Sequence, residues 1–213
     1  IGHMTLIAEI EQQFEISNQT ANYSGQNFDK NDENFLYTTN YDSEFYYLMS
    51  YNLNNGDRSI VYKTNWDVVF SNFSKNDSFR VVAVNEDAQN KIIIKNMNDQ
   101  SDLNLIGLEN MNINRVAFSD DEKMIRISAG SPNSPGDIYT YNLSTNKLNK
   151  ITTNLNSSVN PDDLVNAEVI RYESFDGLEI PAILYKPHSA KKGNKVPALV
   201  WVHGGPGGQS KVG

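Results

Sequence analysis

The sequence contains no cysteine, which excludes disulfide bonds and thiolate metal sites without indicating a compartment. It has no apolar run near the roughly 18 residues that a membrane-spanning helix needs. Its first residues also lack the basic stretch followed by an apolar stretch that marks a signal peptide. We interpret residues 1–4 as a cloning scar, so the compartment stays open, and a soluble protein of the cytoplasm or of the periplasm fits equally.

Basic residues are outnumbered, with 18 Lys and Arg against 26 Asp and Glu, and the net charge at pH 7 is −8. An acidic chain without a basic stripe argues against nucleic acids and membranes as partners. The acidic run from Asp29 lacks the glycine and glutamate that an EF-hand loop requires at its sixth and twelfth positions, and is interpreted as a solvated turn. With three histidines in the whole chain, we expect no metal site and no cofactor.

What the sequence does contain is a repeat with a period of 45 residues. Three similar segments are "FDKNDENFLYTT" from Phe28, "FSKNDSFRVVAV" from Phe73 and "FSDDEKMIRISA" from Phe118. In each unit a Phe precedes a polar turn, a β-rich run, a third short strand and a hairpin turn. A period of 40 to 50 residues with about four strands per unit is typical of β-propeller blades. The alternative is an ordinary β-sandwich in which the similarity is accidental.

The repeat predicts an all-β fold for residues 5–155: a partial β-propeller made of half a blade and three four-stranded blades. The half blade is formed by "IAEI" and "FEIS", which align with the third and fourth strands of an earlier unit. A closed propeller needs 4 to 8 blades, so we expect the ring to be incomplete. Trp66, Trp201 and the tyrosine-rich stretch "YDSEFYYLMSY" are expected to pack in the core of the blades.

The pattern changes after Leu155. Residues 156–166 are polar and contain a proline, as expected of a linker. Residues 167–185 predict a β-hairpin with its turn at Asp176-Gly177. The apolar run "VPALVWV", residues 196–202, is typical of a strand buried on both faces of a sheet, and it leads into the glycine-rich "HGGPGG".

Propeller repeats, a hairpin with a "DG" turn, and "VWVHGGPGG" together resemble the prolyl oligopeptidase and acylaminoacyl peptidase family. In that family a β-propeller precedes an α/β-hydrolase domain that cleaves peptides with a Ser-Asp-His triad. The resemblance implies that residues 167–213 are the N-terminal strands of a truncated α/β-hydrolase domain. Proline iminopeptidases carry a similar glycine-rich run without a propeller, so the upstream repeats favour the first family.

The resemblance also implies roles for the glycine-rich residues. In α/β-hydrolases one oxyanion donor is a backbone N–H from the loop after the third strand. Because Pro206 has no N–H, Gly205 and then Gly204 are the oxyanion-hole candidates, and His203 is expected to orient the loop. The sequence contains no G-x-S-x-G, and Ser210 does not lie in one, so the catalytic triad is expected beyond Gly213.

Two functions remain open at this stage. The first is a fragment of a serine peptidase, inactive as given, whose full-length form hydrolyses peptide bonds of short peptides. The second is a non-catalytic propeller module that binds peptides or proteins. In the hydrolase fold that the chain resembles, the strand Val196–Val202 lies between two later strands, so here both its edges lack partners. We therefore expect Val196 to Gly213 to be poorly ordered or to pair with a second copy or another part of the chain, and the fragment to self-associate.

Overall fold

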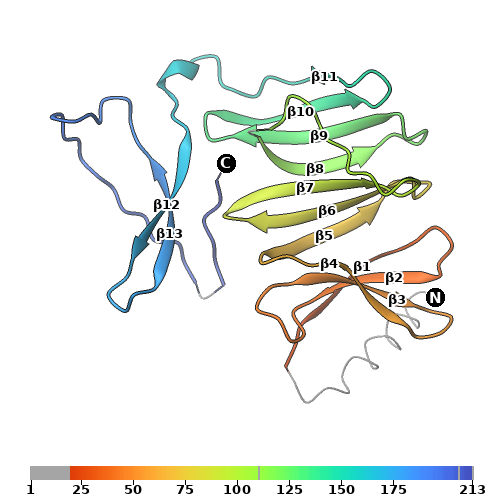
Figure 1. The fold of residues 1–213 in the computed structure, drawn as a ribbon. Coiled ribbons are helices and arrows are strands. Elements are labelled where there is room, and N and C mark those ends of the chain that lie inside the picture. The colour runs from red at the N-terminus through yellow and green to blue at the C-terminus, as the bar shows by residue number, and fades with distance from the viewer. Residues whose placement is uncertain (1–19, 110, 206, 213) are drawn as a thin grey trace.

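The computed structural model describes residues 20–109, 111–205 and 207–212, and within them the chain is all-β (Figure 1). The first sheet has the strand order β1-β2-β3-β4 and the third the order β11-β10-β9-β8, with every neighbouring pair antiparallel. These strands are β1 (Tyr23–Phe28), β2 (Asn34–Thr39), β3 (Tyr47–Asn52), β4 (Arg58–Tyr62), β8 (Asn112–Phe118), β9 (Met124–Ser131), β10 (Ser134–Asn142) and β11 (Lys147–Lys150). Figure 1 shows the sheets stacked one on another. The expected half blade lies outside the described residues.

The 45-residue repeat is confirmed in the backbone. Phe28, Phe73 and Phe118 are each the last residue of the first strand of their sheet. The polar turn that follows contains, at positions 32, 77 and 122, an acidic residue with a positive φ of 53° to 57°. Because equivalent sequence positions take equivalent places and even the same unusual backbone conformation, the three units are copies of one structural motif.

The equivalent turns also contact one another between neighbouring sheets. The Lys30 backbone N–H donates to the Asp77 carboxylate at 2.5 Å, and the Asn76 backbone N–H donates to the Glu122 carboxylate at 2.7 Å. In both cases the acceptor is the residue with the positive φ in the next turn. The repeat therefore sets the stacking of the sheets as well as their internal structure.

The middle sheet departs from the prediction of four strands. It has the order β5-β6-β7, formed by β5 (Asp67–Phe73), β6 (Phe79–Glu86) and β7 (Gln89–Asn96). The expected fourth strand is reduced to one bridge between Lys95 and Asp102. After this bridge Leu103, Leu105 and Leu108 pack into the core between the second and third sheets. Burying these three leucines is more favourable than extending the pairing with β7, because the Asp and Asn residues of the segment have a low propensity for β-strands.

Apolar side chains fill both spaces between the stacked sheets. Leu36, Leu48 and Val82 belong to the core between the first and second sheets, and Trp66 packs against it as predicted. Val81 and Ile125 belong to the core between the second and third sheets. Alternate residues of a strand point to opposite faces, so Val81 and Val82 bury the middle sheet on both sides.

The part of the tyrosine-rich stretch that lies on β3 packs as predicted, whereas Tyr41 before it is exposed. Tyr47 and Tyr51 on β3 are 7% and 8% exposed. Tyr51 clusters with Phe35 and Tyr37 on the face of the first sheet that points away from the second. The stretch therefore contributes to strand packing.

The outer face of the third sheet carries exposed arginines at positions where the other two sheets bury apolar side chains. Leu36, Val81 and Arg126 occupy equivalent positions of the three repeats. The first two are buried against the next sheet, whereas Arg126 is exposed, as is Arg115 on the neighbouring strand. Within the described residues, the third sheet therefore presents charged side chains at positions where the first two sheets bury apolar ones.

The segment after the third sheet forms the predicted hairpin. A 3-10 turn, η1 (Pro161–Asp163), precedes β12 (Ala167–Glu173) and β13 (Glu179–Tyr185), which pair antiparallel. The hairpin turn is closed by a hydrogen bond from Ser174 N–H to the Leu178 carbonyl, and its Gly177 has a φ of +82°. A left-handed φ of this kind favours glycine, which explains the "DG" signal in the sequence.

The prediction of a buried strand at Val196–Val202 is wrong for this structure. These residues form no β-ladder, and Leu199, Val200, Trp201 and Val202 are each more than 80% exposed. The expectation that Trp201 packs in a blade core is wrong for the same reason. An apolar strand of this kind needs neighbouring strands at both edges and cover on both faces, and the described residues provide neither.

The third sheet contains a buried carboxylate whose ionisation should affect acid stability. Asp137 on β10 contacts Lys150 Nζ at 2.6 Å and accepts hydrogen bonds from Thr152 and the Asn154 backbone. The Lys150 contact first, and then the other donors, hold the pKa of Asp137 below its usual value despite burial. A depressed folded-state pKa stabilises the fold above the unfolded value of about 3.9, and this contribution is lost as the pH falls through the folded-state value.

We therefore expect the stability difference between the wild type and Asp137→Asn to be largest near neutral pH and to shrink as the pH falls from about 5 towards the folded-state pKa. Urea unfolding followed by circular dichroism over a series of pH values measures this difference. A pH-independent difference would contradict the assignment.

Candidate functional site

The glycine-rich loop, residues 203–208, follows the exposed apolar run directly. Gly204 and Gly205 are exposed, and a Cβ built on either would meet no atom within 4 Å. His203 Nδ1 lies 2.9 Å from the Gly204 carbonyl oxygen, to which it can donate. A Cβ on Gly208 would overlap that same carbonyl group, so the loop folds back on itself and requires glycine there. Pro206 lies outside the described residues.

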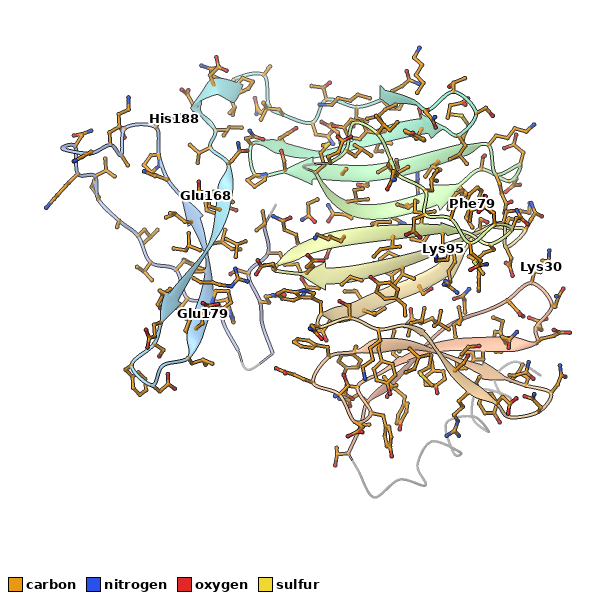
Figure 2. The ribbon with its side chains drawn as sticks, viewed as in Figure 1. Lys30, Phe79, Lys95, Glu168, Glu179 and His188 are labelled. Carbon is orange, nitrogen blue, oxygen red and sulfur yellow. The ribbon has the colours of Figure 1, made fainter. Side chains whose placement is uncertain are left out.

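The two histidines of the described residues hydrogen-bond to the backbone. His188 Nε2 lies 3.3 Å from the Leu164 carbonyl oxygen, on the loop after β13 and away from the three sheets (Figure 2). His203 contacts the Gly204 carbonyl. A nucleophilic serine requires a base within hydrogen-bonding reach, and neither imidazole has a serine hydroxyl as its hydrogen-bond partner in the described part of the chain.

The described residues hold no group of three His, Cys, Asp or Glu side chains that could bind a metal ion. Among these residues there is also no helix long and apolar enough to cross a membrane.

The turn between β6 and β7 is the part of the sheets that meets the C-terminal region. Glu86 pairs with Gln89, which leaves Asp87 and Ala88 as a two-residue hairpin turn with φ values of 53° and 63°. Asp87 Oδ1 is 2.6 Å from Arg171 Nη2 on β12. The hairpin β12–β13 is thereby joined to the middle sheet, at the end opposite to Lys30 (Figure 2).

The last described residues dock at the same turn. The Val212 N–H donates to the Ala88 carbonyl at 2.9 Å, and the Val212 carbonyl accepts from Asn112 Nδ2 at 2.5 Å. Asn85 Nδ2 donates to Gln209 Oε1 at 2.7 Å, and the Val212 side chain is buried at 4% exposure. The sequence analysis missed this site because its parts lie more than 80 residues apart and follow no periodicity.

The arrangement places the glycine-rich loop between two anchors on one turn, Arg171 before it and Val212 after it. The Arg171 guanidinium is shared, since its Nε lies 3.2 Å from Glu179 Oε1 as well as its Nη2 near Asp87. These contacts raise the pKa of Arg171, chiefly through the hydrogen bond to Asp87. The chain on both sides of the glycine-rich loop is therefore bonded to the β6–β7 turn.

Residues 12–154 match the family model of the prolyl oligopeptidase N-terminal β-propeller domain. No curated protein matches the sequence significantly.

Several solved structures share the fold at low sequence identity. Prolyl oligopeptidase B from Galerina marginata, bound to a 25mer macrocyclization substrate, is 18% identical with a TM-score of 0.61; the match covers 78% of this chain and 23% of that one. A puromycin-hydrolyzing peptidase of Mycobacterium tuberculosis is 10% identical with a TM-score of 0.61, covering 76% and 25%. A prolyl endopeptidase is 14% identical with a TM-score of 0.64, covering 83% and 26%.

The chain therefore spans about a quarter of the length of the solved structures that it matches. The family match covers more than half of the chain and includes all three stacked sheets. The resemblance stated from the sequence is confirmed, and the chain belongs to the prolyl oligopeptidase family, of whose N-terminal β-propeller domain residues 12–154 form part.

Proposed function

We propose that this chain is part of a serine peptidase of the prolyl oligopeptidase type, which in its full-length form hydrolyses peptide bonds of short peptides. The observation that carries the proposal is the order of features along the chain. A propeller domain of this family ends at residue 154, and a β-hairpin and an "HGGPGG" loop follow it within about 50 residues. This order matches a propeller followed by the N-terminal strands of an α/β-hydrolase domain.

The same order supports a division into domains. We place the partial propeller at residues 5–155, a linker at residues 156–166, and the start of the hydrolase domain at residues 167–213. The family match ends one residue before the first boundary, and the linker holds only the short η1. Residues 1–4 belong to neither domain.

The glycine-rich loop is proposed to supply one half of the oxyanion hole. Acyl transfer develops a negative charge on the carbonyl oxygen, which preorganised backbone N–H groups stabilise. Gly205, and after it Gly204, would donate, since both are exposed and no side chain covers them. His203 would orient the loop through its contact with the Gly204 carbonyl.

The second candidate is a propeller module that binds peptides or proteins without cleaving them. It is supported by the family match itself, which lies within the propeller, at residues 12–154. The gene downstream of codon 213 distinguishes the two. An open reading frame that encodes G-x-S-x-G supports the peptidase, and an immediate stop codon supports the binding module.

We expect the 213-residue chain to hydrolyse no chromogenic peptide ester or amide, because an oxyanion loop without nucleophile and base has no reaction to stabilise. In the protein encoded by the whole reading frame, Gly205→Pro should lower kcat by about 10²- to 10³-fold, the typical effect of one lost oxyanion donor. His188→Gln is the matched control and should leave kcat unchanged. Turnover by the 213-residue chain that persists through repeated purification, and is lost on Gly205→Pro, would refute this reading.

A further inference from the structure

We propose that the β6–β7 turn and Asn112 form a docking site for residues 209–212, and that Asn112 positions the glycine-rich loop through it. The docking is independent of the proposed function, while the effect on the loop's catalytic role rests on it. Three observations carry the proposal: a comparison of repeat-equivalent residues, the conformation of the turn, and the spacing of the two anchors.

Asn112 differs by one hydrogen-bond donor from Asp67, its equivalent in the second repeat, whereas the first repeat has Asn22 at this position. Asp67 and Asn112 are 45 residues apart, and each begins the first strand of its sheet. Each also accepts a backbone N–H from the preceding sheet: Tyr46 donates to Asp67 Oδ1 at 2.9 Å, and Asn90 donates to Asn112 Oδ1 at 2.8 Å.

A carboxylate is sufficient for that shared task, since it only has to accept. The side-chain amide of Asn112 adds a donor, and this donor binds the Val212 carbonyl. Asn112 therefore makes two hydrogen bonds where Asp67 makes the single bond that both share, and the additional bond is to Val212.

The β6–β7 turn provides the second half of the site. Alanine is sterically disfavoured at a left-handed φ, yet Ala88 adopts one, and its carbonyl accepts the Val212 N–H. Both backbone polar groups of Val212 are thus satisfied by protein partners while its side chain is buried. A buried residue that is bonded at both groups is a fixed point of the chain.

The anchors lie close to the loop on the C-terminal side. Gln209, whose side chain accepts a hydrogen bond from Asn85, directly follows Gly208, the last residue of the loop. Val212 lies four residues beyond Gly208. On the other side, Arg171 ties β12 to Asp87 of the same turn. The glycine-rich loop lies in sequence between Arg171 and Val212, and both residues are bonded to the same turn. These two contacts restrict the movement of the loop, and an oxyanion donor must already be in place before the reaction begins.

Amide hydrogen exchange of the ¹⁵N-labelled 213-residue chain tests the docking. In the wild type, the Val212 amide should exchange at least tenfold more slowly than in an unstructured peptide. Asn112→Asp keeps the acceptor but loses the donor, so the Val212 amide should approach the peptide rate while the Asn90 amide stays protected. Asp67→Asn, the matched control, should change neither amide. Val212→Lys replaces the buried side chain and leaves the sheets intact, so the amide of residue 212 should exchange at the peptide rate while the Asn90 amide stays protected.

A Val212 amide that exchanges at the peptide rate in the wild type, or that stays protected in Asn112→Asp, overturns the docking site. The loop's role is measured separately in the protein encoded by the whole reading frame. There Asn112→Asp should lower kcat about tenfold with KM little changed, since small displacements of reacting groups are costly. An active enzyme in which Asn112→Asp keeps full kcat overturns the positioning role. An enzyme without activity overturns the proposed function and leaves the docking result standing.

Discussion

Val81→Arg should unfold the stack of sheets, whereas Arg126→Val, at the equivalent position of the next repeat, should hardly change its stability. Val81 is 1% exposed and packs between the second and third sheets. An arginine there would place a guanidinium in an apolar core without a partner, which costs on the order of 3–5 kcal/mol or more. That is a large part of the 5–15 kcal/mol by which domains are typically stable.

Arg126 is the matched control because the repeat gives it the same backbone setting with a solvated side chain. A surface substitution of this kind changes the free energy of unfolding by no more than about 0.5 kcal/mol. Urea unfolding of both variants, followed by circular dichroism and tyrosine fluorescence, measures the difference. Equal destabilisation by the two substitutions would show that the Arg126 side chain is not solvated in the 213-residue chain.

The 213-residue chain should self-associate through its exposed apolar run. We propose this from Leu199, Val200, Trp201 and Val202, which form one contiguous patch of side chains that are 81% to 89% exposed. Their backbone forms no ladder, so it is open to pairing with a second copy. Val200→Lys with Val202→Lys should remove most of the association, because charges on a strand block edge-to-edge pairing.

Light scattering and sedimentation over a range of protein concentrations measure this association. Ile60→Lys is the matched control, since Ile60 is an exposed apolar residue of β4 at 59% exposure but lies outside the apolar run. This control should associate like the wild type. A wild-type chain that stays monomeric at every concentration, or a double-lysine variant that associates as strongly as the wild type, would disprove the role of the run.

The sequence by itself determined the features that depend on local chemistry. The polar turns after Phe28, Phe73 and Phe118 and the glycine turn at Gly177 are encoded by residues within a few positions of one another. Alternation along the strands then decides which side chains enter the cores. Because a repeat encodes the same local structure each time, its period was enough to predict a β-propeller, while the family resemblance also needed the hairpin and the glycine-rich run after it.

Tertiary structure alone decided the features that depend on distant partners. The middle sheet has no full fourth strand, because Leu103, Leu105 and Leu108 of that segment pack into the neighbouring core, where they bury more apolar surface than at the sheet edge. Residues 196–202 have the composition of a central strand, yet a strand exists only where neighbours complete its hydrogen bonds. The site at Asn112 and Ala88 has the same origin, since its contact with Val212 joins segments more than 80 residues apart, and no local pattern records such a contact.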